Sequence, residues 1–264
     1  MINMNLLIAP FVNALFAFYY WFGNFGWSIV AVTIILRLVL FPLIWPSLKS
    51  AGKIRELQPK LNKLKEKYGK DKQALAQAQM SLYKNEGVNP MSGCLPQILQ
   101  IAVLLLFFSA FNMVSGFSVG GRGKGSIDDI NAQLIPSFKI SEDFSFNSNF
   151  LGSDLSLTPS KAFSEGMGVN LIMAVVLLLG SGGLQFWAAK VMMPNPKVSE
   201  NIADTTKGKG DDMMSAVRTQ SLYMMPLMTI FIGWNFALGL LLYWFTTSLL
   251  TVGQQVLVNR MGKK

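Results

Sequence analysis

The sequence predicts an all-α polytopic membrane protein, and its composition is the first reason. Hydrophobic residues make up 51% of the 264 residues and charged residues only 14%, whereas a typical soluble domain carries about 25% charged residues. Four long stretches contain no charged residue: 1–36, 87–121, 166–189 and 219–259. Because about 20 apolar residues can cross the hydrocarbon core as a helix, each stretch can contain a transmembrane helix.

The distribution of charge predicts which segments lie on which side of the membrane. Residues 49–86 contain ten Lys or Arg and four acidic residues, whereas residues 122–165 contain four basic and six acidic residues. Eighteen of the 23 basic residues lie in 49–86, 190–218 and the C-terminal tail. Since cytoplasmic segments carry the excess of Lys and Arg, these three are predicted to be cytoplasmic, with the N-terminus outside.

This alternation defines five transmembrane helices. The uncharged stretch 219–259 would be about 61 Å long as one helix, twice the core thickness. It is therefore predicted to be a helical hairpin that turns near Trp234-Asn235-Phe236. We expect an N-terminal interfacial helix (1–24), a first span (25–48), a cytoplasmic basic helical hairpin (49–93), a second span (94–115), an extracytoplasmic loop (116–168), a third span (169–188), a cytoplasmic loop (189–218), a fourth span (219–234), a fifth span (237–258) and a cytoplasmic tail (259–264).

The first apolar segment, residues 6–22, allows two interpretations. It could be a sixth span, but it is short, contains Pro10 and Asn13, and ends in five consecutive aromatic residues. Tyr and Trp prefer the headgroup region of a membrane. A helix in the outer interface is therefore favoured, and a span is the alternative.

The basic segment 50–86 is predicted to be an antiparallel helical hairpin. Apolar residues recur at steps of three and four, the spacing of one helix face. A bend is expected near Gln58-Pro59, because proline removes a hydrogen bond from a helix interior. Asp71 can cap a second helix that reaches about Asn85. The outer loop 116–168 is expected to hold little regular structure beyond a short strand pair.

Several classes of protein are excluded by the residues that are missing. The sequence has no histidine and one cysteine, Cys94, which excludes a disulfide framework, a histidine zinc site and a Ser–His–Asp triad. No acidic residue lies in a predicted span, so an intramembrane enzyme would lack a general base. No Walker A sequence occurs, so ATP is not expected. We expect no enzyme activity, no cofactor and no metal.

Arg37 is the one charged residue inside a predicted span, about halfway along it. A central arginine costs about 2.5–3.5 kcal/mol on insertion scales, so its presence predicts a polar, watered cavity. Thr33, four residues earlier, lies on the same helix face. With no acid in any span, this charge suits an external anion. The alternative is that Arg37 snorkels to a headgroup or binds backbone carbonyls.

Other polar side chains on the predicted spans could line the same cavity. Tyr243, Thr247 and Gln254 fall on one stripe of the fifth span. Hydrogen bonding between helices is an equally good explanation for Gln97, Gln100 and Gln185. For Tyr243 and Trp244, ordinary packing is the favoured explanation. The candidates on the second and third spans are Gln97, Gln100 and Gln185.

Several motifs in order resemble the YidC family of membrane protein insertases, in a short form without a large periplasmic domain. The stretch from Ile35 to Leu43 resembles its first core span, and Val88 to Pro96 resembles the entry to its second. The resemblance covers about residues 25–115 and 169–260. The remaining motifs are Leu57-Gln58-Pro59-Lys60, Leu82-Tyr83-Lys84, Leu242-Tyr243-Trp244 and Gln254-Gln255.

The resemblance implies five core helices around a hydrophilic groove that inserts nascent membrane proteins into the bacterial cytoplasmic membrane. It makes Arg37 the groove arginine and Thr33 its neighbour, and it matches Gln185 and Trp244 to groove positions. The full candidate groove set is Arg37, Thr33, Gln100, Gln185, Tyr243, Trp244 and Thr247, and the candidate hairpin contacts are Lys53, Arg55, Lys60, Lys63 and Lys67.

The partners expected from the resemblance are nascent membrane proteins, the ribosome, the Sec translocon and membrane lipids. The basic hairpin could equally be an ordinary solvated cytoplasmic face, or bind anionic lipid or ribosomal RNA. An anion channel or transporter that uses the same buried arginine is the alternative function.

Overall fold

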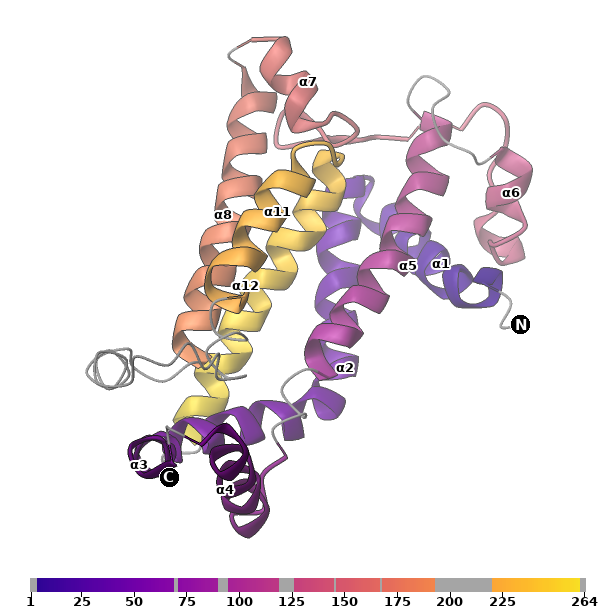
Figure 1. Ribbon diagram of the computed structural model, residues 1–264. Helices are drawn as coiled ribbons and strands as arrows, with labels where there is room; N and C mark the ends of the chain where they lie inside the picture. Colours follow the sequence, from indigo (N-terminus) through magenta and orange to yellow (C-terminus); the bar gives the residue numbers. More distant parts are fainter. Residues whose placement is uncertain are drawn as a thin grey trace.

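The computed structural model describes residues 4–68, 71–89, 95–118, 126–144, 146–166, 168–192 and 220–261. It is almost entirely helical (Figure 1). Among these residues, three helices are long and apolar enough to cross a membrane, at Phe25–Ile54, Val169–Val191 and Leu238–Val258. Shorter apolar helices lie at Ile8–Phe22, Ile98–Val114 and Leu222–Gly233. The protein is thus an all-α polytopic membrane protein, as its composition predicts.

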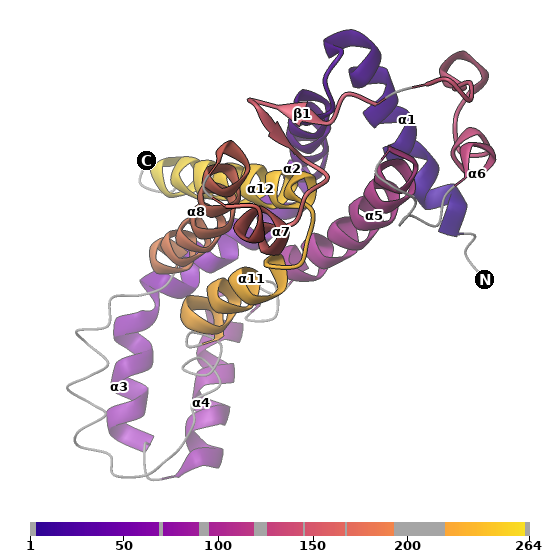
Figure 2. The same cartoon turned by 90° about the horizontal axis from the view of Figure 1, so that it is seen from above.

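The longest helices form one bundle. They are α2 (Phe25–Glu56), α5 (Leu95–Ser118), α8 (Val169–Met192) and α12 (Leu238–Met261). Helix α12 packs against both α8 and α2, and α11 (Met225–Gly233) packs against α8. Figures 1 and 2 show α5 on the other side of α2 from α8. The core of the bundle is therefore built around α12, which brings its side chains close to those of α2 and α5.

The helix ends differ in detail from the predicted spans. Helix α2 contains Pro42 and Pro46 and continues past residue 48 to Glu56. The predicted fourth span corresponds to a five-residue π-helix, η3 (Gln220–Met224), followed by α11. The chain turns between Gly233 and Leu238, where the predicted hairpin turn lies. Most of the predicted cytoplasmic loop 189–218 and the last three residues of the tail lie outside the described residues.

The N-terminal helix α1 (Met4–Phe22) packs against α2 and α5, on the side of the bundle away from α8 (Figures 1 and 2). Its inner face is completely buried at Val12, Leu15 and Phe16. Its last turn exposes Trp21, which is 75% accessible and stacks on Phe22. This is the aromatic end that the sequence assigns to a membrane interface.

The hairpin consists of α3 (Gln58–Tyr68) and α4 (Lys72–Asn85), which extend away from the bundle (Figure 2). Asp71 caps α4, as predicted, by accepting bonds of 3.0 Å from the backbone N–H groups of Gln73 and Ala74. The break between α2 and α3 falls at Leu57, beside the predicted bend. The two helices share a small apolar core of Leu57, Leu61, Tyr83 and Val88.

The outer loop contains the helices α6 (Ile127–Asn131) and α7 (Pro159–Ser164), the 3-10 helix η2 (Pro136–Phe138), and the strands β1 (Asn149–Phe150) and β2 (Ser153–Asp154). The strands pair antiparallel, with Phe150 opposite Ser153. The loop also caps the buried start of α12. The carbonyls of Leu157 and Leu155 accept bonds of 2.8 Å from the N–H groups of Leu238 and Gly239. These donors have no partner within their own helix, so the loop satisfies them.

Candidate functional site

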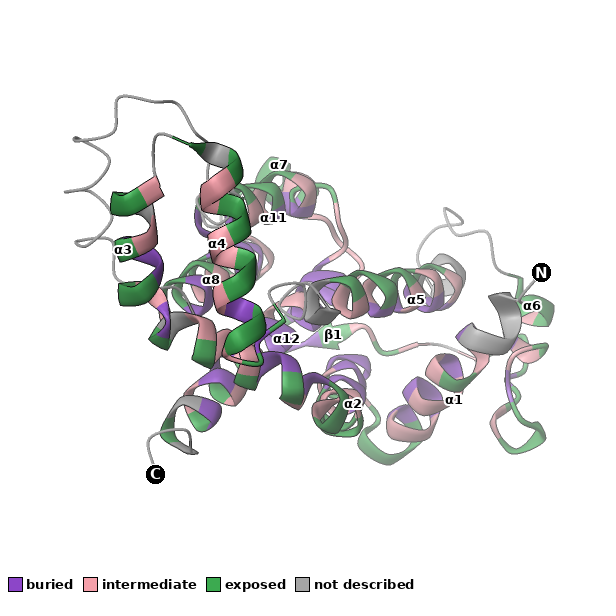
Figure 3. Ribbon diagram, turned by 60° about the horizontal axis from the view of Figure 1, so that its bottom comes forward, coloured by how far each residue is buried: buried purple, intermediate pink, exposed green. Residues whose placement is uncertain are grey.

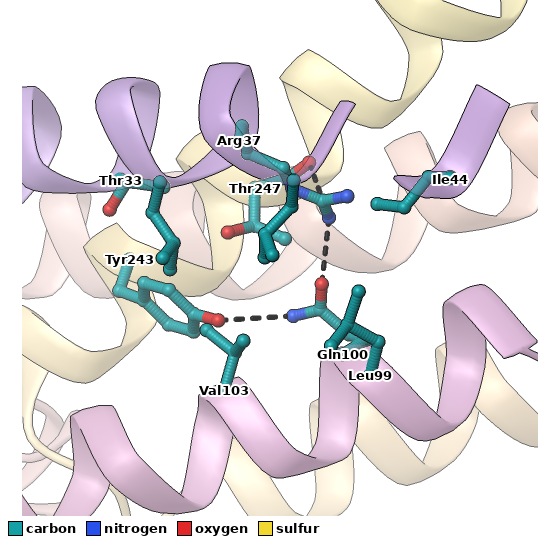
Figure 4. A pocket seen from close by; sticks show the side chains of 10 residues that line it. Thr33, Arg37, Ile44, Leu99, Gln100, Val103, Tyr243 and Thr247 are labelled. Atoms are coloured by element: carbon teal, nitrogen blue, oxygen red, sulfur yellow. Dashed lines mark hydrogen bonds between the residues drawn. The ribbon is translucent and has the colours of Figure 1, made fainter. Parts of the chain in front are cut away.

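A pocket opens between α2, α5 and α12, close to the middle of α2 (Figure 4). It contains about 280 Å³ of empty space, including the part that is open to the surroundings. Its walls combine five polar or charged residues with five aliphatic residues from the three helices. The lining residues are Thr33, Leu36, Arg37, Leu40, Ile44, Leu99, Gln100, Val103, Tyr243 and Thr247.

Arg37 extends into this pocket and is held through one guanidinium nitrogen. Its Nη2 donates to Gln100 Oε1 at 2.7 Å, to Thr251 Oγ1 at 2.9 Å and to the carbonyl of Thr247 at 3.4 Å. Within the described residues no carboxylate forms an ion pair with Arg37, and the one ion pair found joins Lys60 to Glu86. A guanidinium has five N–H donors, and no hydrogen bond of the other two nitrogens is found among the described residues.

Gln100 links Arg37 to a buried tyrosine. Its Nε2 donates to the hydroxyl of Tyr243 at 3.2 Å, while its Oε1 accepts from Arg37 (Figure 4). Tyr243 is 1% exposed and its ring stacks on Phe107, with centroids 4.3 Å apart. A polar chain therefore runs from α2 through α5 to α12 across an otherwise apolar interior.

The two threonines of the predicted set also line the pocket. Thr33 is 1% exposed and donates to the carbonyl of Ile29 at 2.6 Å, and Thr247 is 4% exposed. On the hairpin side of Arg37, Ile44 and Leu48 of α2 meet Val258 of α12 in a buried apolar cluster. The same parts of the two helices also contain buried polar residues, Ser47 of α2 and Gln255 of α12.

Two of the predicted groove residues lie elsewhere. Gln185 accepts a bond of 2.8 Å from the hydroxyl of Thr229, between α8 and α11, and is absent from the pocket lining. Trp244 is also absent from the lining, and its ring lies 6.4 Å from that of Phe236. Of the candidate set, the structure brings together Arg37, Thr33, Gln100, Tyr243 and Thr247.

Thr251 is a contact of Arg37 that the sequence analysis did not single out. Its Oγ1 accepts from Arg37 and donates to the carbonyl of Thr247 at 2.8 Å. The signal that could have found it is its position one helical turn after Thr247, on the stripe that already contains Tyr243. The side chain of Gln97 lies outside the described part of the chain.

The basic side chains of the hairpin point outward. Exposed residues cover much of α3 and α4 (Figure 3). Lys60, Lys63 and Lys67 of α3 are exposed. Two of the predicted hairpin contacts lie instead at the end of α2: Lys53 is exposed, and the side chain of Arg55 lies outside the described part. Lys60 Nζ lies 2.5 Å from Glu86 Oε1. The hairpin therefore presents positive charge to solvent on a surface separate from the pocket.

The chain is similar to a known family of membrane proteins and to several named relatives. The family described as "60Kd inner membrane protein" matches residues 17–264. A "Membrane protein insertase YidC" of Streptomyces avermitilis is 31% identical over 235 residues, which are 89% of this chain and 51% of the relative. The proteins of the same name from Pelobacter propionicus and Rickettsia prowazekii are 30% and 31% identical over 97% of this chain and 39% of each relative.

The chain spans between about two fifths and half of the length of these relatives. The matched part contains every helix of the bundle and the whole Arg37 pocket, so the shared region is the one that carries the candidate site. On the extent of this match, the chain belongs to the 60Kd inner membrane protein family, which includes proteins named YidC.

Proposed function

We propose that this protein inserts nascent membrane proteins into a bacterial cytoplasmic membrane, and that Arg37 attracts acidic residues in the segment to be translocated. The observation that carries the proposal is a central arginine with neutral hydrogen-bond partners and no carboxylate partner among the described residues. The names of the matched relatives favour insertion over the transport of a small anion.

The proposed cycle begins at the hairpin, where exposed lysines meet the incoming chain or its ribosome. The short hydrophilic part of the client then enters the pocket, and its carboxylate approaches Arg37. A charge in a low-dielectric site acts more strongly than one in water. Water in the groove also shortens the hydrocarbon distance that a polar segment must cross.

The energy for insertion comes from the client itself. Its apolar segment moves from the groove into lipid, and burial of apolar surface yields about 25 cal/mol per Å². No nucleotide is required, and the chain contributes positioning and local charge in place of covalent catalysis. We therefore propose an insertase and chaperone that works without ATP.

The topology that fits this function has five spans around the groove, with the N-terminus outside and the C-terminus in the cytoplasm. This orientation places the basic hairpin in the cytoplasm. Its proposed partners there are the ribosome, the Sec translocon and the headgroups of anionic lipids. In this arrangement α1 lies in the outer interface.

The test uses cells depleted of their own insertase and complemented with variants. Two versions of one single-span client are compared, one with an aspartate in its translocated segment and one with asparagine there. Arg37→Ala should strongly reduce insertion of the aspartate client. Arg37→Lys should restore part of it, because lysine keeps the charge but loses the planar fork of donors.

Arg260→Ala is the matched control, because Arg260 is an exposed arginine on α12, near its end. Insertion is read out by protection of the client from external protease. Equal insertion of both clients by Arg37→Ala would reject the attraction role. Saturable uptake of a small anion into liposomes that contain the protein would instead support a transporter.

A further inference from the structure

We infer that Gln100 is a displaceable internal ligand of Arg37. Gln100 occupies the position that a client carboxylate would take, and it links the hairpin-side half of α5 (residues 98–106) to the pocket. The inference rests on the proposed function, since it concerns what the client replaces when it reaches Arg37. It is carried by the hydrogen bonds of Gln100 and by the uneven packing of α5.

Gln100 Oε1 accepts a single short hydrogen bond from Arg37 Nη2. Its length of 2.7 Å is at the short end for charge-assisted hydrogen bonds. The carboxamide oxygen offers the same acceptor as a carboxylate oxygen but without the charge. A client carboxylate binds a guanidinium more strongly, through two parallel bonds. A client with an acidic residue can therefore displace Gln100, whereas a neutral one has no such advantage.

The other partners of Arg37 can remain in place during this exchange. Thr251 Oγ1 and the carbonyl of Thr247 both belong to α12, whereas Gln100 comes from α5. The second bond of Gln100, to Tyr243, is longer at 3.2 Å. Loss of the Arg37 contact therefore removes the stronger of the two polar links that join Gln100 to the other helices.

Helix α5 is firmly packed in one half only. In its outer half, Phe107, Ala110, Phe111 and Val114 are at most 2% exposed. In residues 98–106, all of which are described, only Val103 is buried, at 8%. Figure 3 shows exposed and intermediate residues along the visible face of α5. A segment with few buried contacts opens at low free energy, so the bond to Gln100 matters most for this half.

The consequence is that client binding and movement of α5 are coupled. When a carboxylate takes the place of Gln100, the hairpin-side half of α5 loses its hydrogen bond to α2 while the packing of Leu99 remains, and it can then move aside for the client. A ligand shifts a conformational equilibrium only through its preference for one state. Here that preference is the stronger bond of a carboxylate to Arg37.

The decisive variants are Gln100→Glu and Gln100→Leu, tested with the same aspartate and asparagine clients. Gln100→Glu places a permanent carboxylate on Arg37, so insertion of the aspartate client should fall by about tenfold, the effect of about 1.4 kcal/mol. The readout is the ratio of aspartate-client to asparagine-client insertion, which should fall in Gln100→Glu. Gln100→Leu leaves Arg37 free of this ligand, so a general loss of insertion should affect both clients alike and leave this ratio no lower than in the wild type.

Insertion of the asparagine client also reports whether each variant is folded. This insertion requires the folded helix bundle but not the attraction of a client carboxylate to Arg37. A purely structural role of Gln100 predicts that both substitutions reduce insertion of both clients equally, and that result would overturn the inference. If Arg37→Ala discriminates between the clients but Gln100→Glu does not, the inference fails while the proposed function stands. If Arg37→Ala does not discriminate, the proposed function fails first.

A second measurement follows α5 directly. Amide hydrogen exchange in lipid nanodiscs should be faster in residues 98–104 of Gln100→Leu than in the wild type. Residues 107–114 of the same helix are the internal control and should be unchanged. Faster exchange along the whole of α5, or no change in either part, contradicts the coupling.

Discussion

The backbone of Gly26, at the start of α2, lies directly against the ring of Phe150 in β1. A Cβ atom at Gly26 would be 2.2 Å from Phe150 Cδ2, closer than any two carbon atoms that are not bonded can lie. Phe150 itself is 5% exposed. The outer loop is therefore seated on the first long helix through a contact that tolerates no side chain.

Gly26→Ala should loosen this contact and destabilise the protein. Overpacking of a buried site typically costs about 1–3 kcal/mol, so we expect a lower apparent melting temperature in detergent. Gly52→Ala is the matched control on the same helix, because no atom lies within 4 Å of the position of its Cβ. Equal melting temperatures for the two variants would show that the ring moves aside freely.

Thr251→Val should impair the site without changing the size of the side chain. The substitution removes the oxygen that accepts from Arg37 at 2.9 Å. Hydrogen bonds to charged groups contribute about 1.5–3 kcal/mol, so we expect insertion of an acid-bearing client to fall by about tenfold. Thr246→Val is the control, because the buried hydroxyl of Thr246 bonds the carbonyl of Leu242 in its own helix. A similar loss in both variants would mean that Thr251 acts on the stability of α12 alone.

Asn13→Ala should release the outer loop from α1. The Asn13 side chain donates to the carbonyl of Gln133 at 2.6 Å and accepts from the N–H of Ile135 at 2.8 Å. Without these bonds, we expect trypsin to cleave faster after the exposed Lys139. Asn112→Ala, at an exposed position of α5, should leave the cleavage rate unchanged. An unchanged rate in Asn13→Ala would show that aromatic packing alone holds the loop.

The hairpin should depend on its apolar core more than on its ion pair. Leu61 is 3% exposed, so Leu61→Ala is expected to cost about 2–5 kcal/mol locally. The pair of Lys60 and Glu86 has side chains that are 59% and 35% exposed, and such pairs contribute about 0–1 kcal/mol. Hydrogen exchange of α3 and α4 should therefore rise sharply in Leu61→Ala and little in Lys60→Ala. The reverse order would show that the ion pair dominates.

The start of α6 should weaken in acid. The N–H and hydroxyl of Ser126 donate to Asp129, which lowers the pKa of that carboxyl group below its usual value of 3.8. A lowered pKa means that the ionised form stabilises the fold above the unfolded pKa, and that this contribution is lost as the pH falls through the folded value. Amide exchange of residues 127–131, corrected for intrinsic rates, should therefore accelerate below about pH 4.

Asp129→Asn should remove this pH dependence, because the side chain no longer titrates. Asp128→Asn removes the same charge one position earlier, away from the bonds with Ser126, and should preserve the dependence. Identical pH profiles for the two variants would contradict the role of the Ser126–Asp129 pair.

The sequence by itself determined the three long apolar helices, the turn before α12 and the position of Arg37 along α2. Long uncharged stretches cross hydrocarbon wherever they occur, so the positions of α2, α8 and α12 follow from composition alone. The cap at Asp71 depends on residues next to each other in the chain, so it too could be predicted. A single charged residue in a long apolar stretch is visible in the sequence, so Arg37 could be identified without the structure.

Only the tertiary structure decided which side chains meet Arg37. Gln100 and Gln185 looked equivalent, yet the first binds Arg37 and the second accepts a bond from Thr229. Lipid solvates every apolar face of a helix equally well, so hydropathy does not determine how the helix is rotated about its axis. Packing and hydrogen bonding against neighbouring helices determine this rotation. The same reason explains why Thr251 was missed and why the contact between Gly26 and Phe150 could not be foreseen. Such contacts join residues far apart in sequence, and no local pattern records them.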